Sequence, residues 1–423
     1  MADNQNKTLV NRLVELGERE ATVLEHDALR VIIDDQGGMI PELSGIRGKS
    51  RINAHWQPWF RSNSPRPYND AEHGSFWKGN LLYHIAGSFP CAPNFGPGHF
   101  IEGLTMPPHG WTANQKWQFI NNGIDEETGT AWALSSMRAP AGGRMPLSFR
   151  KIDALIPGQP VHYSSLEITN SGGVDLEINC GWHNTLGAPF LQSDCRISAA
   201  AKRWTSAPLG GEFDTTARLN PGAEFSSLSS APLHQGGKID LSRVPGPIGY
   251  TDFVTGLIPS SAPLGWSALL NPFLKLAYLC FFTGPGNGAE DDIILRFNDL
   301  WMQYGGRPFT PWAPYEGGTD LTYCLGTENA VAAYANGLEY ARRTRQLMGA
   351  PVTALIPAGR TRTLRYGVLF APYDGNALDD GIQSIETEES LLICKGKHDS
   401  SRFTADPAFG VLKKIQTKLA DSR

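Results

Sequence analysis

The sequence lacks three features that would assign it to large functional classes. No run of lysine or arginine is long enough to follow a phosphate backbone, and the net charge is −5, which argues against nucleic-acid binding. No apolar run reaches the roughly 18 residues that a membrane span requires. The opening stretch, MADNQNKTLVNRL, has no basic region followed by an apolar core, so no signal peptide is expected. We therefore predict a cytoplasmic protein that contacts neither nucleic acid nor membrane.

Cysteine is also sparse, with six in 423 residues and no CxxC pair. The cysteines are scattered along the chain (Cys91, Cys180, Cys195, Cys280, Cys324, Cys394). In a chain of this length without an export signal, this pattern indicates buried free thiols rather than a disulfide framework.

Glycine (46) and proline (30) are plentiful, which favours many turns and short strands over a helical bundle. Strand-length runs separated by turn residues dominate. LRVIIDDQGGMIPEL (29–43) and VHYSSLEITNSGGVDLEINCGWHN (161–184) both predict hairpins around Gly-Gly turns, and IPAGRTRTLRYGVLFAP (356–372) predicts a turn and a long strand. The sequence therefore predicts a mainly β protein built as one large antiparallel β-sandwich, with 206–247 as surface loops.

The two ends of the chain show helical spacing instead. Leu9, Leu13 and Leu16 fall at i, i+4 and i+7, which predicts an N-terminal helical arm over 1–25. Asp406 and Pro407 are a favourable N-cap and first helical residue for a C-terminal helix. We expect the sandwich to occupy 26–375 and an extension ending in that helix to occupy 376–423.

Three segments hold residues suited to acid–base chemistry. MPPHGWTANQKW (106–117) places His109 after two prolines and before Gly110, at the head of an expected strand. CGWHNTLGAPF (180–190) places His183 where strand gives way to loop, with Trp182 on the opposite face of the strand. DLTYCLGTENAVAAYANG (320–337) places Glu328 in an apolar run, where a carboxylate must be paired or functional. Taken alone, each histidine is more often structural than catalytic, and Glu328 could as readily form a structural ion pair.

A resemblance favours the functional interpretation. GSFPCAPNFGPG (87–98) followed by MPPHGWTANQKW, then GWHNTLG, CLGTEN and LIPAGRTRTL, resembles the aldose 1-epimerase (galactose mutarotase-like) superfamily in order and spacing from about residue 28 to 372. The glutamate motif is the looser match, because the family's usual Glu-Pro is Glu328-Asn329 here. The resemblance implies a β-sandwich with a cleft across one sheet that holds a pyranose.

The resemblance also implies roles. Glu328 would take the proton from the anomeric hydroxyl, His183 would protonate the ring oxygen, and His109 would bind near the ring oxygen or anomeric centre. The chemistry would need an ionised Glu328 and a charged His183, and no metal or organic cofactor. Further substrate-binding candidates are Asp252, Trp182, Asn184, Trp111 and Arg61; Arg66, in the same polar loop as Arg61, is a weaker candidate.

One departure from the family bears on the substrate. The hexose-6-phosphate branch carries arginines where this chain has Ala86 and Ala113. Because arginine forks usually hold phosphate, their loss predicts a free, non-phosphorylated sugar or sugar acid, bound by a monomer or homodimer. Alternatives are a lyase or hydrolase reaction on the same fold, or a non-catalytic carbohydrate-binding protein. A metal site formed by His84, His99, His109 and His183 matches no familiar zinc spacing.

Overall fold

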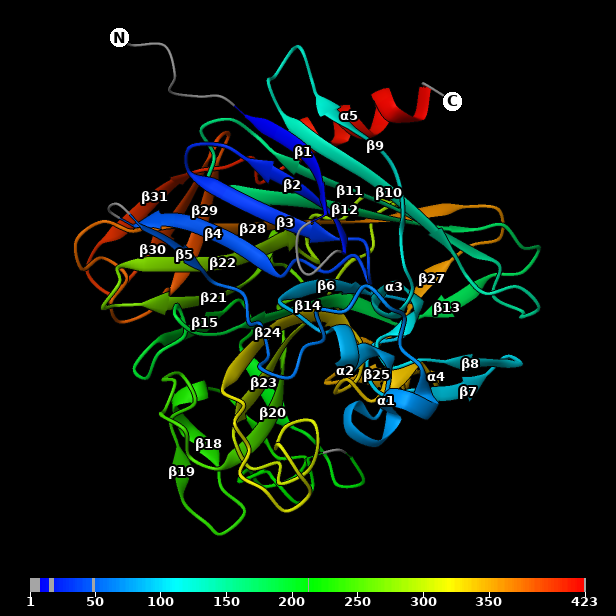
Figure 1. Cartoon of the computed structure of the whole chain (residues 1–423). Coiled ribbons are helices and arrows are strands. Elements are labelled where there is room, and N and C mark those ends of the chain that lie inside the picture. Colours follow the sequence, from blue (N-terminus) through cyan, green and yellow to red (C-terminus); the bar gives the residue numbers. More distant parts are fainter. Residues whose placement is uncertain (1–7, 15–18, 48–49, 212, 422–423) are drawn as a thin grey trace.

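The computed structural model describes residues 8–14, 19–47, 50–211 and 213–421, and two large antiparallel sheets dominate it (Figure 1). The eight-stranded sheet runs in the order β15 (Arg196–Ala199), β21 (Leu264–Asn271), β22 (Leu276–Thr283), β28 (Thr361–Pro372), β12 (Val161–Asn170), β11 (Leu147–Leu155), β10 (Ala131–Arg138) and β9 (Gln118–Ile124). The seven-stranded sheet runs β17 (Glu224–Phe225), β16 (Arg203–Ser206), β20 (Tyr250–Leu257), β23 (Phe297–Tyr304), β24 (Cys324–Val331), β14 (Cys180–Leu186) and β6 (Ser88–Cys91).

Smaller elements surround these two sheets. A five-stranded sheet comprises β1 (Leu9–Val14), β2 (Glu20–Glu25), β3 (Leu29–Asp34), β4 (Glu42–Arg47) and β5 (Ser50–Asn53), and a three-stranded sheet comprises β29 (Ser384–Glu388), β30 (Leu391–Lys395) and β31 (Ser400–Thr404). Two-strand ribbons pair β7 (His99–Ile101) with β8 (Leu104–Met106), β13 (Leu176–Ile178) with β27 (Ala354–Ile356), β18 (Ala231–Pro232) with β19 (Lys238–Ile239), and β25 (Gln346–Leu347) with β26 (Ala350–Pro351). The helices are α1 (Asp70–Trp77), α2 (Asn80–His84), α3 (Gly110–Asn114), α4 (Gly337–Thr344) and α5 (Gly410–Asp421).

The main core lies between the eight-stranded and seven-stranded sheets. Trp182 of β14 stacks on Tyr366 of β28 with ring centres 5.0 Å apart. The Tyr366 hydroxyl lies 2.7 Å from Asn184 Nδ2 and 2.6 Å from Asn329 Nδ2, so polar groups between the sheets satisfy one another. Because side chains alternate along a strand, the neighbours His183 and Glu328 face the outer side of the seven-stranded sheet. The predicted β-sandwich is thus confirmed.

The N-terminal helix prediction is wrong. Leu9 and Leu13 lie in β1, which pairs antiparallel with β2, and Leu16 lies outside the described residues. The five-stranded sheet packs against the eight-stranded sheet, with β2 against β10, β3 against β12 and β4 against β28. Sheet pairing therefore outweighs the helical spacing of a few leucines.

The hairpin predicted around residues 170–173 is also wrong, although the one at 29–43 is confirmed by the β3–β4 pairing. β12 pairs with β11 and β28, β13 pairs with β27, and β14 joins the other sheet. Between β12 and β14 the chain therefore crosses from the eight-stranded sheet to the seven-stranded sheet. As a result, the His183 side chain faces the outer side of the seven-stranded sheet and not the core.

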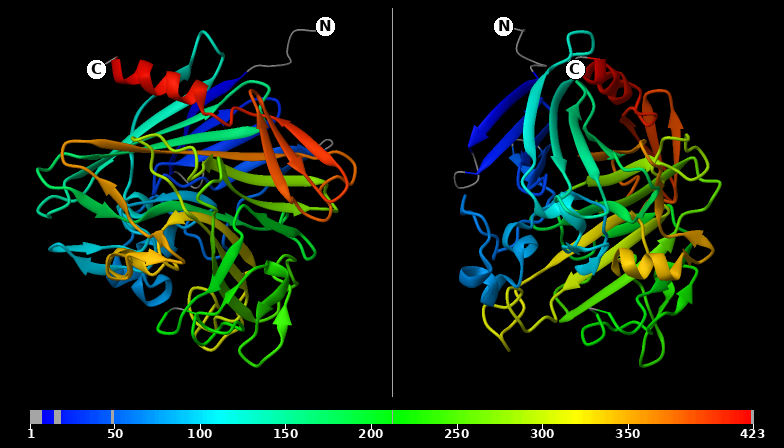
Figure 2. Two further views of the ribbon diagram at one scale, coloured as in Figure 1. Left: turned by 180° about the vertical axis from the view of Figure 1, so that it is seen from behind. Right: turned by 90° about the vertical axis from the view of Figure 1, so that its right-hand side faces the viewer.

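The C-terminal helix is confirmed but begins later than expected. α5 starts at Gly410, and Asp406 Oδ2 accepts a hydrogen bond from the backbone of Val411 (2.8 Å). Figure 2 shows α5 in red at the opposite end of the molecule from α1 and α2. In the described residues, no helix is long and apolar enough to cross a membrane.

Candidate active site

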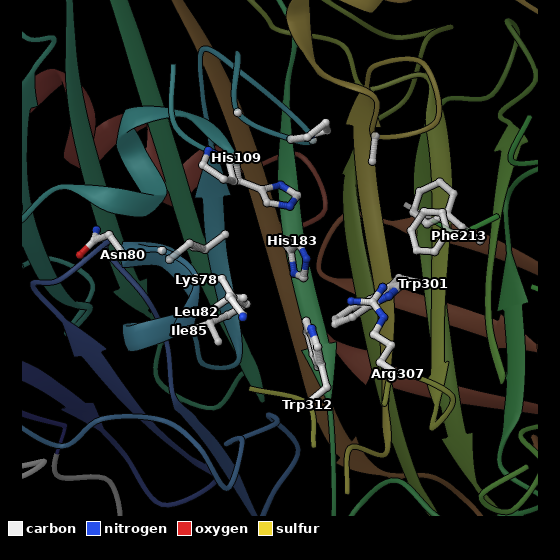
Figure 3. Close-up of a pocket in the computed structure, with 18 of the residues that line it drawn as sticks. Lys78, Asn80, Leu82, Ile85, His109, His183, Phe213, Trp301, Arg307 and Trp312 are labelled. Atoms are coloured by element: carbon white, nitrogen blue, oxygen red, sulfur yellow. The ribbon is translucent and has the colours of Figure 1, made fainter. Parts of the chain in front are cut away.

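A pocket of about 390 Å³ opens on the outer face of the seven-stranded sheet, within the size range of small-molecule sites. Its floor comes from β14, β23 and β24, and its walls come from the α1–α2 segment, the loop before α3 and the loop after β23 (Figure 3). All three residues predicted to be catalytic, His109, His183 and Glu328, line this pocket. The structure thus brings together residues that are up to 219 positions apart in the sequence (328 − 109).

His183 and Glu328 form a contact across adjacent strands. His183 Nε2 lies 3.2 Å from Glu328 Oε1, and both side chains are almost fully buried. Thr185 Oγ1 lies 3.0 Å from His183 Nδ1, and the Phe89 ring stacks on the imidazole with centres 4.6 Å apart. A Cβ at Gly326 would meet Glu328 Oε1 at 2.6 Å, so the glycine leaves room for the carboxylate. The imidazole is held on both edges and one face.

His109 approaches the same pair from above the sheet. It has a left-handed backbone (φ 57°) immediately before α3, and its ring meets that of His183 edge-on at 5.0 Å. Gly110 follows at φ 76°, and a Cβ there would meet Ala92 O at 2.2 Å. The Cys91 Sγ lies 3.5 Å from His109 Nδ1. The strand expected for 109–117 is instead the short helix α3, because the turn at His109 and Gly110 reverses the chain.

Burial, together with the charge of His109, lowers the pKa of His183 well below its ordinary value. A buried imidazole favours the neutral form, so His183 gives up a proton more readily than a free histidine does, and the charged His183 beside an ionised Glu328 stays a prediction. With the proton on Nε2, the ring can donate to Glu328 Oε1 and accept from Thr185 at Nδ1.

None of the five residues predicted to bind substrate lines the pocket. Trp182 and Asn184 face the opposite way, into the core between the sheets. Trp111 is buried in α3 and packs in the main core. Asp252 accepts from the backbone and side chain of Arg218 (both 2.7 Å) and so anchors a loop. The orientations of Trp182 and Asn184 follow from the alternation of side chains along β14, because only every second residue of that strand can face the pocket.

Arg61 belongs to a separate ion cluster. Its guanidinium donates to Asp34 Oδ2 (2.9 Å) and to His84 O (3.1 Å), and Arg19 also binds Asp34. Arg66 is exposed in its loop. No group of three or more histidine, cysteine, aspartate or glutamate side chains with metal-holding geometry occurs in the described part of the chain.

Sequence reasoning missed one wall of the pocket. The segment NDLWMQYGGRPFTPW (298–312) supplies Trp301, Arg307 and Trp312. Phe213 and Phe253 complete an aromatic wall opposite α2, as Figure 3 shows for the residues it labels. In this segment a Gly-Gly turn and the arginine after it lie between two tryptophans. That pattern is a sequence signal from which this wall could have been predicted.

Comparisons with known proteins support the fold but not the chemistry. No family model matches the sequence, and no curated protein matches it. A Klebsiella pneumoniae protein provisionally described as an aldose 1-epimerase superposes with a TM-score of 0.63 at 13% identity, covering 87% of this chain and 84% of that one. A galactose mutarotase-like protein from Clostridium acetobutylicum gives 0.55 at 10% identity, covering 86% and 99%.

A third structure, provisionally described as a mutarotase from Salmonella typhimurium, gives a TM-score of 0.51 at 11% identity, covering 86% of this chain and 94% of that one. Identities this low speak for shared architecture alone. The chain therefore has the galactose mutarotase-like fold, a β-sandwich with an aromatic-lined pocket on the outer face of one sheet.

Proposed function

We propose that this protein is a mutarotase-like isomerase that interconverts the anomers of a free sugar or sugar acid. The observation that carries the proposal is the contact between His183 Nε2 and Glu328 Oε1 (3.2 Å), with the His109 ring 5.0 Å from His183, on the floor of an aromatic pocket. A proton acceptor and a proton donor side by side are what ring opening of a pyranose requires.

The reaction follows from this pair. Glu328 takes the proton of the anomeric hydroxyl, the C1 carbonyl forms as the bond from C1 to the ring oxygen breaks, and His183, which enters the step protonated, gives its Nε2 proton to the ring oxygen and is left neutral. Rotation about C1–C2 presents the other face of the aldehyde, and the same transfers run in reverse to close the ring. In this proposal His109 donates a hydrogen bond near the ring oxygen, and Trp301 and Phe253, which line the pocket, contact the apolar side of the sugar.

The test is exchange spectroscopy by NMR on a panel of free aldoses and uronic acids. Acceleration of α–β exchange by the protein, lost in Glu328→Gln, is the expected result. If no sugar in the panel exchanges faster with protein than without it, the proposed activity is wrong.

A further inference from the structure

One side chain that contacts the His183 ring lies outside the pocket lining. Thr185 stands two positions after His183 on β14, so both side chains face the outer side of the seven-stranded sheet. Thr185 Oγ1 lies 3.0 Å from His183 Nδ1, and the residue is only 1% exposed. Because Thr185 does not line the pocket, it can influence a ligand only through another residue.

Three neighbouring segments hold the backbone of Thr185. Its N–H donates to Gly87 O (3.0 Å), and its carbonyl oxygen accepts from Trp56 N (2.8 Å). On the other side of β14, Thr185 lies opposite Gly326 in the register with β24. A β-branched side chain on a strand has few rotamers open to it, so the hydroxyl is fixed beside the imidazole before any ligand arrives.

The second nitrogen of the His183 ring faces the proton acceptor. Nε2 lies 3.2 Å from Glu328 Oε1, and the Phe89 ring stacks on the imidazole face. Turning the ring over would break the contact at Nδ1 and the contact at Nε2 together. Nε2 is therefore the nitrogen that exchanges a proton in the reaction proposed above.

A hydroxyl suits the position beside Nδ1 because it can both donate and accept a hydrogen bond. When His183 is neutral with its proton on Nε2, Thr185 donates to the bare Nδ1. When His183 is charged, Nδ1–H donates to Thr185 Oγ1, and it still does so after Nε2 has given its proton to the ring oxygen. The hydroxyl keeps its own hydrogen throughout, so no proton passes to Thr185.

A carboxylate in the same place would have a different effect. A negative charge beside Nδ1 stabilises the imidazolium and makes it a weaker acid, whereas a hydroxyl adds no charge. The ring oxygen of a sugar is a weak base, so a more acidic imidazolium protonates it more readily. Burial already lowers the pKa of His183, and Thr185 can orient the ring without reversing that effect.

We propose, resting on the function proposed above, that Thr185 is a positioning residue whose hydroxyl binds His183 Nδ1 throughout the reaction and so keeps Nε2 towards the substrate. In other enzymes a third group often orients the histidine that carries the proton, and that group is commonly a carboxylate. Here a neutral hydroxyl takes this place, which fits a histidine that acts as a proton donor.

Three titratable groups surround His183: Glu328 on β24, His109 before α3 and Cys91 on β6. Figure 3 shows the rings of His109 and His183 next to each other. Burial raises the pKa of the Cys91 thiol well above its ordinary value. All three groups are retained in a Thr185 variant, so a change in the titration of His183 there reports the loss of the hydroxyl.

The experiment compares Thr185→Val and Thr185→Ser with wild type. Valine keeps the shape and removes the hydrogen bond, so kcat for anomer exchange should fall about 10- to 100-fold with KM within about twofold. An imidazolium without a partner at Nδ1 is less stable, so the alkaline limb of the pH–rate profile should move down by about 1 unit. Serine restores the hydroxyl, and kcat should return to within about threefold of wild type.

NMR of the ring nitrogens gives a readout that needs no activity. The signals of His183, assigned by their loss in His183→Gln, should show one tautomer in the wild type and a mixture in Thr185→Val. The matched control is Thr205→Val, which alters a buried threonine of the same sheet whose Oγ1 lies 3.4 Å from Tyr334 Oη. It should leave kcat, the pH–rate profile and the His183 signals unchanged.

Three results would overturn the inference: wild-type kcat and pH–rate profile in folded Thr185→Val, a single His183 tautomer in that variant, or a Thr185→Ser variant as slow as Thr185→Val. Thermal unfolding shows whether each variant folds, and Thr185→Ala takes the place of Thr185→Val if the valine variant does not. A changed tautomer with no anomer exchange for any sugar contradicts the proposed function alone. Anomer exchange that is indifferent to Thr185→Val contradicts the role of Thr185 alone.

Discussion

Two of the buried clusters of charged and histidine side chains differ in what surrounds them. The sealed cluster (Arg19, Asp34, Arg61, His84) lies under the N-terminal sheet, where Asp34 accepts from both arginines and from the backbone of Gln36. The pocket cluster (His109, His183, Glu328, Arg307) lies along a cavity. Both are buried and both shift pKa values, so neither property marks a site by itself.

Electrostatics show the same contrast. In the sealed cluster, burial and two arginines lower the pKa of His84 to about 3, and burial lowers that of Arg61 to about 10. In the pocket cluster, burial and His109 lower the pKa of His183. The comparison teaches that access to a cavity, and not the size of a shift, separates groups that can act on a ligand from groups that hold the fold.

The largest effect is expected from Glu328→Gln. The amide cannot accept the anomeric proton, so kcat for anomer exchange should fall by about 10³-fold, with little change in thermal stability. The control is Glu167→Gln, which alters a carboxylate paired with Arg150 on the eight-stranded sheet and should keep full activity. Full activity in Glu328→Gln would show that the pocket cluster is as purely structural as the sealed one.

The opposite outcome is expected from Asp34→Asn. It leaves two buried guanidinium groups without their carboxylate, which should lower the free energy of unfolding by about 3–5 kcal/mol. Urea denaturation measures this loss. The KM and kcat of the folded fraction should be unchanged, and a specific loss of substrate affinity would mean that the sealed cluster reaches the ligand.

Strand alternation, a short-range signal, predicted the sandwich. The three pocket residues were singled out by the resemblance to the aldose 1-epimerase superfamily, because their spacing alone left a structural role open. Sequence reasoning failed where the outcome depended on which strands pair. β1 became a strand because β2 was available to pair with it, and the run through residue 173 crossed between layers instead of turning back. Arg61 was misassigned and Arg307 was missed for the same reason: both are arginines beside aromatic residues, and only the packed fold decides which one faces a cavity.

Asp299 belongs to neither cluster, and it tests whether a buried titratable group beside the pocket takes part in catalysis or only in stability. It lies beside Glu328 on the neighbouring strand, and burial raises its pKa to about 7, while Thr255 Oγ1 donates to its Oδ1 (2.5 Å). Because the folded carboxyl keeps its proton above the pKa of the unfolded chain, the stability that it contributes is lost as pH rises from about 4 to 7. Asp299→Asn should therefore remove a decline of about 2–3 kcal/mol between pH 5 and 8.

Urea denaturation of wild type and Asp299→Asn across that pH range measures the effect. Thr255→Val, which removes the donor to the carboxylate, should steepen the decline instead. Asp299 does not line the pocket, so kcat in the Asn variant should stay within about twofold; a fall like that of Glu328→Gln would assign Asp299 to the catalytic groups.

The smallest effect is expected from His109→Asn, which keeps a residue type that tolerates the left-handed backbone and removes a titratable neighbour of His183. Since the charge of His109 lowers the pKa of His183, its loss should raise that pKa. The alkaline limb of the pH–rate profile, where His183 loses its proton, should move up by about 0.5–1 unit. His99→Asn, a change at a histidine away from the pair, should leave the limb in place. A limb that stays fixed in His109→Asn would mean that the two histidines act independently, and the pocket cluster would then be a set of neighbours instead of one coupled acid–base unit.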